Sequence, residues 1–274
     1  MRNAVAFRCV AALLMTVALA NVAGATRGGT IILAGGGDLG PEILNRFQLE
    51  AQAVFAGTRH PPVILIPTAI EGEHPSTEEA AASTFLSKMG MRVTILHTRN
   101  HDVANSKAFL EVLKKGRVVW IAGGQPQLLI SAYSGTRVGK ELKGLLDRGG
   151  VIAGDSAGAS FLASFLVCRP CEGPPVLSLN NRGLGILPQV AVDPHLTARD
   201  RSKDLPQLLM GHRGFLGVGI DENTAAVIQG GILEVIGSGI VAIYKPDSKA
   251  ALDRRYSLSA GGRFNWNDRE PVER

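Results

Sequence analysis

Short, continuously apolar runs alternate with longer amphipathic segments over residues 30–153. The apolar runs predict five strands, at Thr30–Ala34, Val63–Ile66, Val93–Leu96, Val118–Ile121 and Val151–Ala153. The segments between them predict four helices, at Pro41–Phe55, Ser76–Met89, Asn105–Lys114 and Val138–Asp147. Strands that are apolar throughout are typical of a parallel sheet covered on both faces. The pattern therefore predicts a three-layer, doubly wound α/β fold with a mostly parallel sheet.

Beyond Gly183 the apolar runs become more frequent and the helical segments disappear. Five further strands are expected, at Gln189–Val192, Val218–Ile220, Ala225–Gln229, Ile232–Ile236 and Ile240–Ile243. The segment Tyr256–Trp266 resembles a hairpin that turns at Ala260–Gly262. The chain shows no repeats and no linker, so residues 26–274 are expected to form a single catalytic domain with a strand-rich C-terminal part.

The first 25 residues have the pattern of a secretory signal peptide. Arg2 and Arg8 precede an apolar run at Val10–Ala20, and the small residues Ala23–Ala25 offer a cleavage site. The alternative is an uncleaved membrane anchor. The cleavage site favours export, so we expect a periplasmic or secreted protein that no longer contacts the membrane after cleavage at Ala25.

Composition excludes several classes of protein. The chain has 274 residues, 45% of them hydrophobic and 19% charged, which is not the composition of a disordered protein. Without residues 1–25, 27 basic and 24 acidic residues remain, a net charge of +3 that indicates no nucleic-acid partner. Cys168 and Cys171 are then the remaining cysteines, and their proline-rich surroundings favour a local disulfide or free thiols over redox catalysis.

The segment Gly35–Gly40 follows a predicted strand and matches G-x-G-x-x-G. A dinucleotide site also needs an acidic residue about 20 positions later, for the ribose hydroxyls. The chain reads Arg59-His60-Pro61-Pro62 there. We therefore interpret Gly35–Gly40 as a tight strand-to-helix turn at the rim of a site, and expect no cofactor.

A second motif, Gly154–Gly158, reads G-x-S-x-G between the strand Val151–Ala153 and a helix expected over Ala159–Phe165. In this context the central serine sits on a sharp turn at the carboxyl end of a strand. Ser156 is therefore a candidate nucleophile, and the Ala157 N–H is a candidate oxyanion donor. The alternative is a small-residue turn in which Ser156 only caps the helix.

A serine nucleophile needs a base and an acid that orients the base. Of the six histidines, His195 and His212 follow Ser156. His212 lies in a glycine-flanked turn, whereas His195 directly follows a strand, as do Asp221 and Glu222. Because sites in open parallel sheets lie beyond the carboxyl ends of strands, the order Ser156, His195, Glu222 places all three groups at strand ends, and Asp221 is the alternative acid.

These segments together resemble peptidase family S51, which includes cyanophycinases and aspartyl dipeptidases. The motifs that carry the resemblance are GGGD at 35–38, VILIPTA at 63–69, IAGGQ at 121–125, DSAGA at 155–159, GLGILP at 183–188, DPH at 193–195 and GIDENTA at 219–225. The resemblance covers nearly the whole of residues 26–274. It implies a class I glutamine amidotransferase-like fold and a serine-type exopeptidase with a Ser156-His195-Glu222 triad. It also implies that the Gly124 and Ala157 N–H groups form the oxyanion hole.

The same resemblance implies that Gln125, Asp193, Arg199 and Arg201 contact a peptide substrate containing acidic residues, such as a cyanophycin-type or Asp-X peptide. Alternatively, Arg199 and Arg201 belong to a solvated segment of mixed charge and have no role in binding a substrate. The chain departs from the family at GGQPQ (123–127), at Leu196, where an aromatic residue is common, and at Asp204, where cyanophycinases have a third arginine. These departures concern the choice of substrate rather than the serine chemistry.

Two other functions remain open at this point: an esterase that uses the same Ser156 with His212, and a binding domain that keeps the fold without catalysis. A homodimer is a candidate assembly. His97 and His101 give a weak hint of a metal site, but no metal is expected in the catalytic chemistry.

Overall fold

The computed structural model describes residues 28–70, 75–167, 181–246 and 254–272, with only the backbone described at 75–81 and 254. The proposed signal peptide and the Cys168–Cys171 pair lie outside these residues. Within the described part of the chain, no helix is long and apolar enough to cross a membrane.

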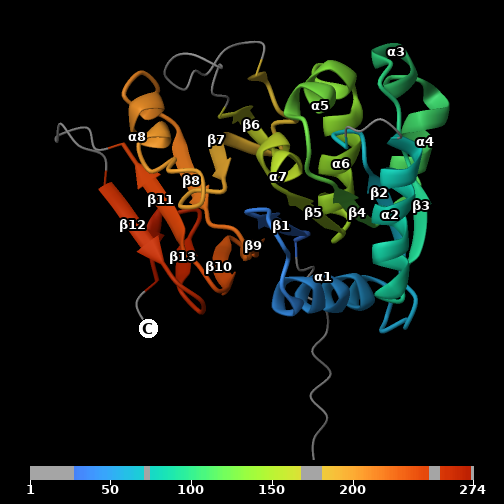
Figure 1. The fold of residues 1–274 in the computed structure, drawn as a ribbon, viewed down its shortest axis with the longest axis horizontal. Helices are drawn as coiled ribbons and strands as arrows, with labels where there is room; N and C mark the ends of the chain where they lie inside the picture. The colour runs from blue at the N-terminus through green and yellow to red at the C-terminus, as the bar shows by residue number, and fades with distance from the viewer. Residues whose placement is uncertain (1–27, 71–74, 168–180, 247–253, 273–274) are drawn as a thin grey trace, which may run out of the picture.

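The described strands form two sheets (Figure 1). The first has nine strands in the order β14-β13-β10-β9-β1-β5-β4-β2-β3. Its strands are β1 (Thr30–Ala34), β2 (Pro62–Ile66), β3 (Arg92–Ile95), β4 (Val118–Ile121), β5 (Val151–Asp155), β9 (Thr224–Gln229), β10 (Ile232–Gly237), β13 (Arg263–Asn265) and β14 (Glu270–Pro271). The five strands β1 to β5 run parallel to one another, and β9 continues the sheet antiparallel to β1. This parallel half is the α/β fold that the sequence predicts.

The second sheet has five strands in the order β12-β11-β8-β7-β6. Its strands are β6 (Ala163–Leu166), β7 (Leu187–Pro194), β8 (Leu216–Ile220), β11 (Val241–Lys245) and β12 (Arg254–Leu258). Strands β6, β7 and β8 are parallel, and β7 and β8 end side by side, with Pro194 paired to Ile220. The two sheets lie next to each other in the molecule, with β8 and β11 of the second sheet against β9 of the first (Figure 1).

Helices cover both faces of the parallel strands. They are α1 (Pro41–Val54), α2 (Pro75–Lys88), α3 (His101–Ala104), α4 (Lys107–Lys115), α5 (Pro126–Tyr133), α6 (Val138–Asp147), α7 (Ala157–Leu162) and α8 (Asp204–Leu209). On one face, Phe47 of α1 and Leu86 of α2 pack on alternate strand residues such as Ile32 and Leu65.

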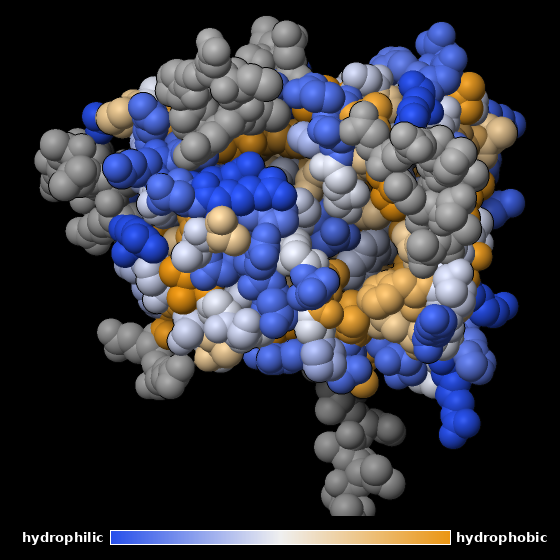
Figure 2. Space-filling model, in the orientation of Figure 1, coloured by the Kyte–Doolittle hydropathy of each residue, from blue (hydrophilic) through white to orange (hydrophobic). Residues whose placement is uncertain are grey.

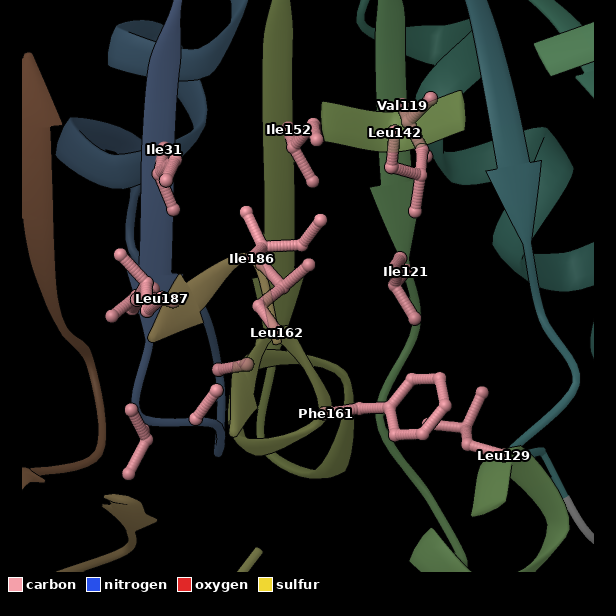
Figure 3. Packing of buried hydrophobic residues seen from close by; sticks show 14 of the residues in the cluster. Ile31, Val119, Ile121, Leu129, Leu142, Ile152, Phe161, Leu162, Ile186 and Leu187 are labelled. Carbon is pink, nitrogen blue, oxygen red and sulfur yellow. The ribbon is translucent and has the colours of Figure 1, made fainter. Parts of the chain in front are cut away.

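The opposite face of the parallel strands carries the larger core. Ile31, Ile121 and Ile152 pack there against Phe161 of α7 and Leu142 of α6 (Figure 3). The same core includes residues from both sheets, so the two sheets share one hydrophobic interior. Alternation of strand side chains between two covered faces confirms the predicted three-layer arrangement.

Two local predictions are wrong. The predicted helix Ala159–Phe165 begins two residues earlier, and its second half is strand β6 instead, because Ala163–Leu166 pairs with β7. The predicted hairpin Tyr256–Trp266 is not a hairpin: β12 pairs with β11 in one sheet, and β13 pairs with β10 in the other. The short helices α3, α5 and α8 were not expected from the sequence.

Candidate active site

Ser156 sits at the sharp turn between β5 and α7. Its backbone angles, φ 48° and ψ −117°, are unusual for a residue that is not glycine. The Ser156 N–H donates to the carbonyl oxygen of Ala34 at the end of β1, at 3.0 Å. This strained turn projects the side chain from the carboxyl edge of the sheet, as expected of a nucleophile elbow.

The structure brings Ser156, His195 and Glu222 together in one hydrogen-bonded chain. Ser156 Oγ lies 2.7 Å from His195 Nε2, and His195 Nδ1 lies 2.6 Å from Glu222 Oε1. Ser156 follows β5 of the nine-stranded sheet, whereas His195 and Glu222 follow the adjacent strands β7 and β8 of the five-stranded sheet. The chain of three side chains therefore crosses the junction between the sheets.

The alternative partners make other contacts. Asp221 accepts hydrogen bonds from Thr197 N–H at 3.0 Å and from Ile240 N–H at 3.0 Å, so its carboxylate holds two loops. His212 Nδ1 lies 3.2 Å from the Leu208 carbonyl oxygen. The geometry thus selects Glu222 over Asp221, and His195 over His212, as the groups linked to Ser156.

The surroundings of His195 favour its neutral form. The residue is only 5% exposed, and this burial is the main cause that lowers its pKa below the ordinary value. The hydrogen bond and charge of Glu222 oppose the shift, while the positive charges of Arg199 and Arg201 add to it. A neutral imidazole can accept a proton from Ser156, which is what a general base requires.

The glycine segment after β1 lies against the Ser156–His195–Glu222 chain. Gly36 has φ +88°, and a methyl group there would lie 2.5 Å from His195 Cε1 and 2.9 Å from Ser156 Cβ. A methyl at Gly37 would lie 2.9 Å from Glu222 Oε2. The interpretation of 35–40 as a tight turn at the rim of the site agrees with this position.

The Gly123–Gln125 segment, which we call the oxyanion loop, lies on the other side of Ser156. Gly124 has φ +136°, and a Cβ there would meet the Ala69 carbonyl oxygen at 2.2 Å. The same oxygen accepts a hydrogen bond from Gln125 N–H at 2.7 Å.

Asp155, beside Ser156, accepts hydrogen bonds from Gly123 N–H at 3.1 Å and from Trp120 Nε1–H at 2.8 Å. Burial raises the pKa of the Asp155 carboxyl, and these two hydrogen bonds oppose that shift.

A cavity of about 690 Å³ opens in front of Ser156. Its lining includes five of the residues expected from the sequence to contact substrate or transition state: Gly124, Gln125, Ala157, Arg199 and Arg201. Figure 2 shows strongly hydrophilic side chains gathered over β7 and β8 on this side of the molecule. The cavity therefore combines the serine with two guanidinium groups, which suits a substrate with a carboxylate.

Asp193 does not line this cavity. Its side chain is 0% exposed, and its Oδ1 accepts from Arg201 Nη1 at 2.8 Å. Arg201 also donates to the Pro194 carbonyl oxygen at 3.3 Å. The structure thus places Asp193 behind Arg201, where its carboxylate holds the guanidinium.

Comparison with known proteins agrees with the resemblance seen in the motifs. Residues 31–236 match the family model of peptidase family S51. The chain belongs to peptidase family S51. This family assigns it a serine-type peptidase activity.

Curated relatives of this S51 peptidase include two cyanophycinases. The one from Geminocystis herdmanii is 29% identical over 90% of this chain and 96% of the relative. The one from Trichormus variabilis is 32% identical over 81% of this chain and 75% of the relative. Among solved structures, a peptidase from an acI-B1 Actinobacterium has the same fold, with a TM-score of 0.69 at 24% identity over 88% of this chain and 98% of that chain.

The histidine pair that hints at a metal makes protein contacts in this S51 peptidase. His97 Nδ1 lies 2.9 Å from Thr68 Oγ1, and His101 Nε2 lies 3.2 Å from the Ser134 carbonyl oxygen. Over the described ranges, no group of three or more candidate ligands is arranged to hold a metal ion.

The contacts of two residues at the site do not follow from the sequence pattern. Asp155 enters the sequence pattern only as part of the G-x-S-x-G motif, although a carboxylate at the end of an otherwise apolar strand is itself a signal. Gly36 belongs to the turn expected at the rim, but its contact with the imidazole and the serine becomes apparent only in the structure. Both residues contact segments that are distant in the sequence, so the local sequence pattern does not identify their partners.

Proposed function

We propose that this protein is an exported serine exopeptidase, similar to cyanophycinases, that hydrolyses peptides containing acidic residues. The observation that carries the proposal is the Ser156–His195–Glu222 hydrogen-bonded chain, with distances of 2.7 and 2.6 Å, at the edge of a cavity that contains two arginines. Export rests on the signal-peptide pattern of residues 1–25.

In the first step, His195 Nε2 takes the proton of Ser156 Oγ as that oxygen attacks the carbonyl carbon of the scissile bond. Glu222 accepts the Nδ1–H of His195, fixes its tautomer and stabilises the imidazolium that forms. The carbonyl oxygen becomes an oxyanion, which the N–H groups of Gly124 and Ala157 bind. Each such donor is typically worth about 3 kcal/mol of transition-state stabilisation.

In the second step, His195 returns the proton to the leaving amine as the C–N bond breaks. A water molecule then attacks the acyl-enzyme ester while His195 takes one of its protons. His195 returns that proton to Ser156 Oγ as the ester bond breaks and the carboxylic acid product leaves. The enzyme needs no cofactor or metal for these steps, because the serine, the imidazole and the backbone donors supply every proton transfer and charge.

The arginines support a preference for substrates with carboxylates. Arg201 is held by Asp193 at 2.8 Å and lines the cavity together with Arg199. A guanidinium fixed in this way can bind a carboxylate with two parallel hydrogen bonds. The relatives named cyanophycinase support a cyanophycin-type peptide as one class of substrate. The resemblance of the motifs to peptidase family S51, which includes aspartyl dipeptidases, adds Asp-X dipeptides as the other class.

The test is an assay of the purified protein on cyanophycin, on a series of Asp-X dipeptides and on p-nitrophenyl esters. We expect peptide hydrolysis that His195→Ala abolishes and that His212→Ala leaves within about threefold of the wild type. Loss of activity in His212→Ala but not in His195→Ala would instead support the esterase arrangement. No hydrolysis of any peptide would contradict the proposal.

A further inference from the structure

Asp155 has no part in the proton transfers proposed above, although it precedes Ser156 directly. Its two carboxylate oxygens each accept one N–H: Oδ1 from the Trp120 indole at 2.8 Å and Oδ2 from Gly123 at 3.1 Å. Trp120 belongs to β4 and Gly123 to the oxyanion loop. The carboxylate therefore ties the turn that carries Ser156 to the loop that faces it.

The oxyanion loop is fixed on both sides of Gly124. On the N-terminal side, Asp155 holds the Gly123 N–H. On the C-terminal side, the Ala69 carbonyl oxygen accepts the Gln125 N–H at 2.7 Å. The chain directly before the loop packs on the start of α7, because a Cβ at Gly158 would lie 2.1 Å from the carbonyl oxygen of Ile121, the last residue of β4. Two hydrogen bonds thus flank the Gly124 N–H, one of the two N–H groups proposed to bind the oxyanion.

We propose that Asp155 is a positioning residue that sets the direction of the Gly124 N–H through its hydrogen bond to Gly123. The inference rests on the proposed function, since it assigns Asp155 a task within the same site. A preorganised donor is effective because it needs no rearrangement when charge develops on the substrate oxygen. Displacing such a donor by about 1 Å can cost about 100-fold in rate.

The chemistry requires a carboxylate at this position. Asp155 receives two N–H donors, one on each oxygen, and an ionised carboxylate offers only acceptors. In an Asp155→Asn variant one of the two oxygens becomes an NH₂ group, which would face an N–H donor. One of the two hydrogen bonds must then break, and the buried indole competes with the loop for the remaining oxygen.

The experiment compares Asp155→Asn with wild type on the best peptide substrate, measuring kcat, KM and the pH profile of kcat/KM. We expect kcat to fall about 10- to 100-fold while KM stays within about threefold. The acid limb, which reports His195, should keep its midpoint. A variant that merely distorts the site would move KM or this midpoint as well.

Trp120→Phe is the matched control. It removes the indole donor and some packing against Phe47, but it leaves the hydrogen bond between Asp155 and Gly123 in place. Its melting temperature should fall at least as far as that of Asp155→Asn, while its kcat stays within about threefold of wild type. An Asp155→Asn enzyme with wild-type kcat would overturn the inference, as would a Trp120→Phe enzyme that loses kcat equally.

Ser156→Ala separates this inference from the proposed function. If Ser156→Ala is inactive and Asp155→Asn is fully active, only the role of Asp155 is wrong. If Ser156→Ala retains wild-type activity, the serine mechanism fails and the role of Asp155 fails with it.

Discussion

At the scale of single residues, the site depends on how closely backbone can approach the three side chains. Gly36 illustrates this, because its Cα lies where any side chain would meet both His195 and Ser156. The motif G-x-G-x-x-G is present in the sequence, and its glycines lie against the loop that carries Glu222: a Cβ at Gly35, Gly37 or Gly40 would meet Asp221, Glu222 or Asn223, respectively. The contact of Gly36 with the imidazole joins segments far apart in the sequence, so the local pattern does not reveal it.

Gly36→Ala should therefore inactivate the enzyme. The new methyl would lie 2.5 Å from His195 Cε1, so the imidazole must move away from Ser156. We expect a loss of about 100-fold or more in kcat/KM, measured on the best peptide substrate. Gly57→Ala is the control, because Gly57 has a similar φ of +79° but nothing within 4 Å. It should lose about 1 kcal/mol of stability and keep its activity. Equal activity of the two variants would contradict the role given to Gly36.

The lowered pKa of His195 sets the pH range of activity. A general base must be neutral, so the acid limb of kcat/KM should have its midpoint below pH 6.5, the ordinary value for histidine. Arg199→Ala removes a nearby positive charge that lowers this pKa, so the midpoint should rise. Glu222→Gln removes a negative charge that raises this pKa, so the midpoint should fall. The maximal value of kcat/KM should fall as well. Shifts in the same direction for both variants would contradict the assignment.

At the scale of elements, strand ends determine which side chains meet. The pairing of Pro194 with Ile220 brings the ends of β7 and β8 together and so places His195 near Glu222. The sequence predicted this meeting from the rule that sites lie beyond the carboxyl ends of parallel strands. It could not predict that β7 and β8 belong to a second sheet, since an apolar run does not reveal its hydrogen-bonding partner.

The errors in element assignment have the same cause. The run Ala157–Leu166 is mostly apolar, so its sequence does not distinguish helix from strand, and only the pairing of Ala163 and Phe165 with β7 decides it. A turn signal at Ala260–Gly262 is real, but it takes the chain from one sheet to the other. Local signals specify turns and helix starts, whereas partners across a sheet are set by tertiary packing.

Asn223 connects the loop that carries Glu222 to the start of α1. Its Oδ1 accepts the Gly40 N–H at 2.8 Å, and its φ is 51°, a conformation that Asn tolerates better than Ala. Asn223→Ala should lower the free energy of unfolding by about 2 kcal/mol, measured by urea titration. Asn223→Gly keeps the backbone conformation and loses the side-chain hydrogen bonds, namely the Oδ1 acceptor for Gly40 and the Nδ2 donor to Ser238 Oγ at 3.2 Å, so it should lose about 1 kcal/mol. An alanine variant within about 0.5 kcal/mol of wild type would contradict this account.

At the scale of the whole molecule, the two sheets share one core, and the site lies where they meet. The larger hydrophobic cluster includes Ile31 and Ile152 from the nine-stranded sheet together with Val190, Val218 and Val241 from the five-stranded sheet. Separating the sheets would expose this core and break the contact of Ser156 with His195 at the same time. The family, the fold and the three linked side chains were all expected from the sequence, whereas the shared core became apparent only in the structure.

Activity and structure should therefore be lost together. In a urea titration, peptide hydrolysis and far-ultraviolet circular dichroism should show the same midpoint, because one cooperative unit holds both halves of the site. Loss of activity at a clearly lower urea concentration, with the dichroism still native, would indicate that the five-stranded sheet unfolds or separates on its own.

The central claim is that Ser156 is the nucleophile of a peptidase. The most direct measurement is the rate at which purified wild-type and Ser156→Ala proteins hydrolyse cyanophycin or the best Asp-X dipeptide, with circular dichroism confirming that both are folded. Removing a serine nucleophile typically costs about 10⁶-fold in kcat. We predict measurable hydrolysis by the wild type and none above background by the folded Ser156→Ala variant. Hydrolysis by Ser156→Ala at the wild-type rate would contradict the account.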